Sequence, residues 1–107
     1  LRNKVTVTSS NRWFLKHIKK LHPELSTGYV AEHRLIDPVK VAQSLGCDML
    51  AISISLATEQ TIKRAKQAAL HVSCWTVNDF STMEILKRYG VDSIITDLPT
   101  MALERFS

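Results

Sequence analysis

Residues 71–96 read HVSCWTVNDFSTMEILKRYGVDSIIT, and this stretch contains the clearest strand–helix–strand pattern of the chain. Its two ends, 71–77 and 91–96, are short runs rich in β-branched and apolar residues, which is the composition of strands. The residues between them repeat apolar side chains at helical spacing and stop at Gly90, a residue type that commonly ends a helix. A strand, a helix and a second strand in this order form the unit from which parallel sheets are built.

The start of the central helix carries a signal of its own. Ser81 and Glu84 have the spacing of a capping box, in which each side chain binds a backbone N–H group of the first turn. Phe80 and Ile85 are spaced as a hydrophobic staple around it. We therefore expect Ser81 to cap this helix.

Three further strands precede this unit, at residues 4–8, 27–30 and 49–55. The helix after the first of them stops before Pro23, because proline cannot continue a helix. The helical spacing predicts its inner side as Trp13, Phe14, Ile18 and Leu21, with the lysines facing out. The whole chain then contains five strands that alternate with helices.

The next two helices have sharper boundaries. Asp37-Pro38 opens one of them with a capping side chain and a proline at the first helical position, and Gly46 closes it. Thr58 with Glu59 opens the other. Its inner stripe is predicted to be Ile62, Ala65 and Ala69, whose small members favour close packing on a sheet.

Right-handed crossovers would lay the five strands parallel, with the helices outside. Two architectures fit: a complete flavodoxin-like sheet with helices on both faces, or five consecutive units of a (β/α)8 TIM barrel. In both of them, functional side chains gather at the C-terminal ends of the strands. The polar residues there are Ser9, Ser10, Asn11, Glu32, His33, Ser55, Thr76, Asn78, Thr96 and Asp97.

Composition restricts the function. The 107 residues suffice for one domain, and no apolar run approaches the roughly 20 residues that cross a bilayer, so no membrane segment is expected. The net charge of +4 comes from bases scattered over helix faces, which favours a solvated surface over a nucleic-acid footprint. Cys47 and Cys74 lack the short spacing of a metal or redox pair, so free thiols in a reducing compartment such as the cytoplasm are expected.

Two binding classes are excluded by what the chain lacks. With 3 glycines it has no Gly-rich phosphate loop of the dinucleotide or P-loop type. No acidic cluster follows the first strand, as a phosphate-accepting receiver domain would require. A two-carboxylate metal site or an acid/base pair is not visible either.

A family resemblance favours the barrel over the flavodoxin-like sheet. Trp75-Thr76-Val77-Asn78, followed after the helix by residues 90–97 and Pro99, resembles the C-terminal signature of glycerophosphodiester phosphodiesterases. Upstream, residues 7–10, 23–30 and 45–54 resemble three earlier strands of that family in the same order. One departure is Asn11, where the family commonly has an aromatic residue after the paired serines.

The resemblance implies a (β/α)8 barrel of which residues 1–107 are a partial domain, at about strands four to eight. The whole barrel would hydrolyse glycerophosphodiesters to an alcohol and glycerol 3-phosphate, using a divalent cation (magnesium or calcium) and two histidines. The family's catalytic histidines and its metal-binding carboxylates have no counterpart here and would precede Leu1. The chain alone is therefore expected to bind no metal and to be inactive.

The resemblance also suggests substrate-binding residues. Trp75 is expected to form an apolar face beside the glycerol moiety, with barrel core as the alternative. Asn78 would donate a hydrogen bond or position a loop, with a helix cap as the alternative. Ser10 would line the pocket, although a turn is also a common role for serine. Asp97 is expected to cap a last helix rather than bind a metal, and His33 to lie at the functional rim.

Two hypotheses follow for the partners. In the first, the chain is an enzyme portion whose barrel is completed by a missing N-terminal part and whose ligand is a small glycerophosphodiester. In the second, it is a noncatalytic half-barrel or a flavodoxin-like module that self-associates or binds a small phosphorylated ligand. Open strand edges invite pairing in either case.

Overall fold

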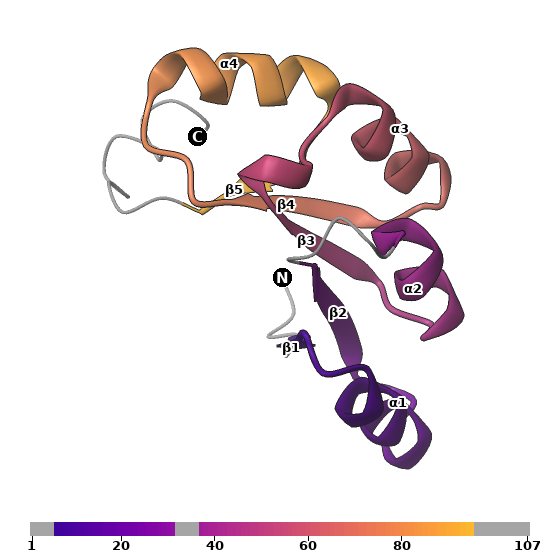
Figure 1. The fold of residues 1–107 in the computed structure, drawn as a ribbon. Coiled ribbons are helices and arrows are strands. Elements are labelled where there is room, and N and C mark those ends of the chain that lie inside the picture. The colour runs from indigo at the N-terminus through magenta and orange to yellow at the C-terminus, as the bar shows by residue number, and fades with distance from the viewer. Residues whose placement is uncertain (1–5, 32–36, 96–107) are drawn as a thin grey trace.

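A computed structural model describes residues 6–31 and 37–95. Its elements alternate between strand and helix along the chain (Figure 1). They are β1 (Thr6–Ser9), α1 (Arg12–Leu21), β2 (Ser26–Ala31), α2 (Pro38–Ser44), β3 (Met49–Ser53), the 3-10 turn η1 (Ile54–Leu56), α3 (Glu59–Gln67), β4 (His71–Trp75), α4 (Phe80–Tyr89) and β5 (Ser93–Ile94). None of the helices in these ranges combines the length and the apolar character needed to span a membrane.

The strands form one parallel sheet in the order β1-β2-β3-β4-β5. Each strand thus pairs with its neighbour in sequence, and Figure 1 shows the sheet as an open arc with α1 to α4 along its outer side. A flavodoxin-like sheet would reverse its strand order at a switch point and carry helices on both faces. The sequential order excludes that alternative and confirms five consecutive units of a barrel.

The hydrophobic core lies between the strands and the helices. Alternate strand residues point toward the helices, and they are almost fully buried there: Tyr29, Ala31, Leu50, Ile52, Val72 and Cys74. Each helix contributes its own inner residues, among them Leu15, Val39, Ile62 and Met83. The side chains between these strand residues point to the concave face instead.

Helix α1 packs on the sheet through a different side from the one predicted. Leu15 is its buried residue, at 1% exposure. Of the four predicted inner residues, Ile18 is partly buried, whereas Trp13, Phe14 and Leu21 are exposed. Lys19 does not face out either, because its side chain reaches the carbonyl of Leu25. The prediction was wrong because helical spacing marks apolar residues on more than one side of this helix, and only one side meets the sheet.

The predicted starts of α2 and α3 are confirmed. Asp37 Oδ1 accepts hydrogen bonds from the backbone N–H groups of Val39 and Lys40, and Thr58 Oγ1 accepts one from Thr61. On the inner side of α3, Ile62 and Ala65 are buried as predicted. Ala69 is not part of that stripe. The helix ends at Gln67, and Ala69 is exposed with a left-handed φ of 62°.

The start of α4 corrects the capping prediction. Asp79, not Ser81, is the N-cap, because its Oδ2 accepts from the backbone N–H and the hydroxyl of Thr82 at 2.9 Å each. A carboxylate is favoured at this place because it faces the positive end of the helix dipole. Ser81 therefore lies inside the first turn. The predicted end is confirmed: Gly90 takes φ 103°, which is strained for other residues.

The last three strands are shorter at their ends than predicted, whereas β2 extends one residue beyond the predicted 27–30 at each end. The third strand gives way to η1 at Ile54, and the fourth ends at Trp75 rather than Val77. The fifth is confined to Ser93–Ile94. The predicted strand start at Lys4, the loop of Glu32 and His33, and the last strand end and helix at Thr96, Asp97 and Pro99 lie outside the described residues.

A clamp at the N-terminal ends of the strands joins β4 to β5. Asp92 Oδ2 accepts from the backbone N–H of Val72 at 2.8 Å and lies 2.6 Å from Lys66 Nζ. The backbone N–H of Asp92 donates to the carbonyl of Val72 at 2.8 Å, and Lys66 also donates to the carbonyl of Leu70. We call these four residues the β4–β5 clamp.

The same arrangement joins β2 to β3, and we call it the β2–β3 clamp. Asp48 Oδ2 accepts from the backbone N–H of Thr27 at 3.1 Å, and Asp48 N–H donates to the Thr27 carbonyl at 2.8 Å. Lys19 donates to Leu25 O, but its Nζ lies 3.8 Å from the carboxylate. Each clamp aspartate comes two residues after a helix-ending glycine. Both clamps lie on the rim opposite the functional one, which in barrels serves stability.

Candidate functional site

The C-terminal ends of the strands form the rim where a barrel carries its chemistry. After β1, Ser9 Oγ accepts from the backbone N–H of Asn11 at 3.0 Å, and Asn11 Oδ1 accepts from Phe14 at 3.0 Å. Asn11, where the family commonly has an aromatic residue, is thus the N-cap of α1. Ser10 is exposed between these two turn-forming residues. Its side chain remains available at the rim.

At the ends of β3 and β4 the structure places Trp75 beside a serine pair. The register of the two strands sets Ser53 opposite Trp75, and Ser53 Oγ lies 2.9 Å from Ser55 Oγ. Trp75 is half-buried, and its indole N–H is buried with no hydrogen-bond partner among residues 6–31 and 37–95. A buried N–H group of this kind usually finds an acceptor.

Asn78 follows directly on the same rim. Val77 before it is buried, and its backbone N–H donates to the carbonyl of Ile95, which holds this loop against the end of the sheet. Asn78 itself is exposed, and the neighbouring Asp79, not Asn78, caps α4. Ser10 belongs to the same rim but not to the same end of the sheet, because β2 and β3 separate β1 from β4.

Sequence reasoning missed Ser53 as a neighbour of Trp75. Part of this signal is in the sequence, because alternation of side chains along each strand places Ser53 and Trp75 on the same face of the sheet. Each of them is also the last residue of its strand. Their register could not be read from the sequence, because parallel pairing depends on how two separate crossovers close.

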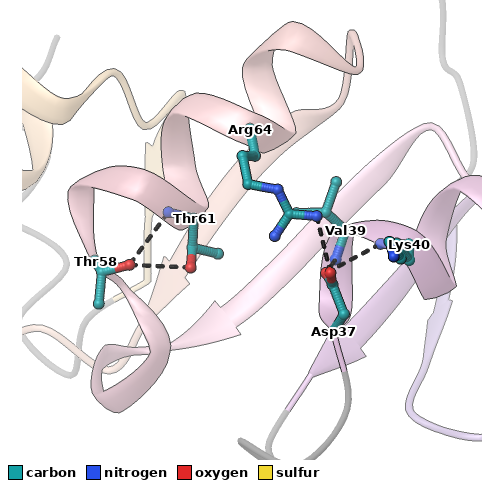
Figure 2. Close-up of polar contacts among 6 residues, drawn as sticks. All are labelled: Asp37, Val39, Lys40, Thr58, Thr61 and Arg64. Atoms are coloured by element: carbon teal, nitrogen blue, oxygen red, sulfur yellow. Dashed lines mark hydrogen bonds and ion pairs between the residues drawn. The ribbon is translucent and has the colours of Figure 1, made fainter.

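A groove of about 400 Å³ lies at the rim between α2 and α3. Asp37 Oδ2 accepts from Arg64 at 2.8 Å across this groove, and Figure 2 shows both side chains reaching toward each other. The hydrogen bond from Arg64 lowers the pKa of Asp37, against the opposing effect of burial, and the N–H groups of Lys40 and Val39 lower it further. Asp37 is therefore a charged structural group that joins two helices.

The rim does not contain a metal site within the described ranges. No group of three or more histidine, cysteine, aspartate or glutamate side chains is close enough there to hold an ion. The carboxylates that lie at helix starts are already engaged: Asp37 with Arg64, Glu59 with Lys63, and Asp79 with Thr82. These residues do not fit a divalent cation, and no catalytic step is assigned to one here.

The cysteines do not supply a nucleophile. Cys47 and Cys74 are free and buried, and both point into the helix-packed core. Burial raises the pKa of the Cys74 thiol to about 11, and burial also raises the pKa of Cys47. Their thiolates are disfavoured at neutral pH, so both residues act as small core residues.

Comparison with known proteins assigns the family. Residues 1–101 match the model of the glycerophosphoryl diester phosphodiesterase family. The chain belongs to this family. A glycerophosphodiester phosphodiesterase of Caldanaerobacter subterraneus subsp. tengcongensis is 28% identical over 96 residues, which are 90% of this chain and 40% of the relative.

Solved structures of family members carry the same arrangement of strands and helices. A phosphodiesterase of Oleispira antarctica, in complex with the product sn-glycerol-3-phosphate, matches with a TM-score of 0.84 and 27% identity over 94% of this chain. A glycerophosphodiester phosphodiesterase of Parabacteroides distasonis matches with a TM-score of 0.79 and 25% identity over 92%. The chain spans 41% of each of these structures, so its five units are part of a TIM barrel.

Proposed function

We propose that this phosphodiesterase-family chain forms the C-terminal wall of a barrel that hydrolyses glycerophosphodiesters to an alcohol and glycerol 3-phosphate. The observation that carries the proposal is the match of residues 1–101 to the family over an open parallel sheet in barrel order. The metal-binding carboxylates and catalytic histidines would come from preceding units, since the described residues do not fit a metal. The free, buried cysteines suit a reducing compartment such as the cytoplasm.

The side chains on the concave face of the sheet support the proposal that further strands complete the barrel. By register, Val30, Ala51, Ser73 and Ser93 form one row across it. Three of these side chains are small, and Ser93 donates to Ser73 at 3.0 Å. A closed barrel is filled by layers of side chains from all its strands. A row this shallow requires larger side chains from the opposite strands, and a second copy of the same chain would supply small ones again.

The helices give a second, independent indication. Among helices α1 to α4, exposed large hydrophobic side chains occur on the two end helices: Trp13, Phe14 and Leu21 on α1, and Phe80 and Ile85 on α4. Outside these helices, Ile54 and Ile95 are the exposed large hydrophobic residues of the described ranges. The middle helices α2 and α3 expose no large hydrophobic side chain. This distribution is expected where the end helices lack the neighbours that a complete ring of helices would provide.

In the complete barrel, Trp75 would offer an apolar face to the glycerol moiety, beside Ser53 on the next strand. Its unpartnered indole N–H supports a position that ligand or added strands complete. Asn78 would hydrogen-bond to substrate or position the loop, and Ser10 would line the opposite end of this wall.

A chimera tests the proposal. Residues 1–101 would replace the matching segment of the Caldanaerobacter enzyme, and release of glycerol 3-phosphate from glycerophosphoethanolamine would be measured with magnesium or calcium. We expect turnover that disappears on chelation, because the supplied half carries the metal site and this chain the wall. A folded chimera with no turnover, beside an active parent enzyme, would reject the proposed role.

A further inference from the structure

Trp13 lies on a side of α1 that barrel completion leaves uncovered. Leu15 faces the sheet, and at 100° per residue Trp13 lies about 160° around the helix from it, nearly opposite. Phe14 and Leu21 lie together on one flank, about 100–120° from Leu15, where a neighbouring helix would cover them. Trp13 is 83% exposed and would stay so in a closed ring of helices.

Basic residues without carboxylate partners surround this tryptophan. Helix α1 contains no acidic residue, and Arg12, Lys16 and Lys20 have no ion pair with any part of the chain that the structure describes. Helix α3 differs in this respect. Its bases Lys63, Arg64 and Lys66 each lie within 3.0 Å of a carboxylate. We call Arg12, Trp13, Lys16 and Lys20 the Trp13 face.

We propose that the Trp13 face binds the surface of membranes that contain anionic phospholipids. Tryptophan favours the level of the headgroups, because its ring is apolar and its N–H group is polar. Unpaired lysines and arginines are attracted to an anionic leaflet, and each one raises the binding constant about five-fold. A single-stranded nucleic acid would also stack its bases on an indole, but such sites lie in basic grooves that follow the phosphate backbone, whereas Trp13 lies on the side of α1 that faces away from the sheet.

The position of this face connects it to the functional rim. Arg12 and Trp13 begin the first turn of α1, and only the N-cap Asn11 separates them from the exposed Ser10 that follows β1. Binding through them would bring the rim close to the lipid surface, where diesters derived from phospholipids are released. This last point rests on the proposed hydrolysis, whereas membrane binding itself does not. The two can therefore fail separately.

Vesicle sedimentation tests the proposal without any activity measurement. The purified chain would be mixed with vesicles of phosphatidylcholine alone or with 30% phosphatidylglycerol at low salt. We expect binding to the anionic vesicles that weakens as salt is raised, and little binding to the neutral ones. Lys16→Gln with Lys20→Gln should reduce it about thirty-fold, and Trp13→Ala should reduce it further at every salt concentration.

Matched variants separate the face from general charge and stickiness. Lys40→Gln with Lys63→Gln removes the same charge from α2 and α3, and Ile85→Ala removes an exposed apolar side chain from α4; both should bind like the parent chain. Equal binding to neutral vesicles, equal loss in these controls, or no binding to anionic vesicles would overturn the proposal. So would binding to polyglutamate as tight as to anionic vesicles and insensitive to Trp13→Ala, which would favour a polyanion site.

Discussion

Replacing Asp92 with alanine is expected to lower the free energy of unfolding by about 2 kcal/mol, the cost of a lost charge-assisted hydrogen bond and an unpaired backbone group. Val72 is fully buried, and its N–H group would lose the 2.8 Å bond to the carboxylate. Lys66 would lose its 2.6 Å partner. Denaturant unfolding measures the change, with Asp92→Asn as the variant that keeps one acceptor oxygen and part of the stability.

Asp48→Ala is the matched control, because it removes the aspartate of the β2–β3 clamp. Lys19 Nζ lies 3.8 Å from Asp48 Oδ2, against 2.6 Å between Lys66 Nζ and Asp92 Oδ2. The side chain of Asp48 is 56% exposed, against 30% for Asp92. We expect a smaller loss for Asp48→Ala than for Asp92→Ala. An equal or larger loss for Asp48→Ala would show that the β4–β5 clamp gains nothing from its closer geometry.

The contribution of Asp92 should depend on pH. Burial alone would raise its pKa, but the hydrogen bonds from Lys66 and Val72, together with the attraction of nearby positive charge, outweigh burial, so the pKa of folded Asp92 lies below its ordinary value. Such a group stabilises the fold fully above the unfolded-state pKa of about 4 and loses that effect as pH falls through the folded-state pKa. The difference in stability between the parent chain and Asp92→Ala should shrink in that acidic range. A difference independent of pH would contradict the charged clamp.

Replacing Trp75 with alanine in the active chimera is expected to reduce kcat/KM by about 10- to 100-fold, the loss that follows from removing an apolar contact of 1.5–3 kcal/mol. Trp75→Phe should retain most of the activity, since it keeps an aromatic face. Thermal unfolding of both variants distinguishes the two roles. A variant that is less stable yet fully active would place Trp75 in the barrel core and remove it from the pocket wall.

The local parts of the fold could be predicted from the sequence. The starts of α2 and α3 were correct because Asp37-Pro38 and Thr58 act on their own first turns, through contacts two or three residues apart. The end of α4 was correct because Gly90 alone takes the left-handed conformation there. Asp79 shows the limit of such rules, since two capping residues two positions apart compete, and the carboxylate prevails.

The nonlocal parts could not be predicted in the same way. Trp13, Phe14 and Leu21 are apolar at helical spacing, yet the sheet covers Leu15 instead. The sequence of this helix alone does not determine which of its sides packs against the strands. The choice between a barrel and a flavodoxin-like sheet likewise depended on strand order, which alternation of strands and helices leaves open.

The position of the candidate site could be predicted from the sequence, but not which residues lie beside one another in it. Trp75, Asn78 and Ser10 lie at the rim expected for them. The pairing of Trp75 with Ser53, and the two strands that separate Ser10 from both, depended on register and sheet order. The roles of these three residues toward substrate stay predictions, and the family resemblance was their source.

Glycerol 3-phosphate release by a two-part mixture tests whether this chain completes a catalytic barrel. The purified chain, the separately produced N-terminal part of a family barrel, and their mixture would each be given glycerophosphoethanolamine with magnesium or calcium. We expect no turnover from either part and metal-dependent turnover from the mixture, because the metal site and the wall then meet in one barrel. Metal-dependent turnover by the purified chain alone would contradict the account, since it would require a catalytic site within these 107 residues.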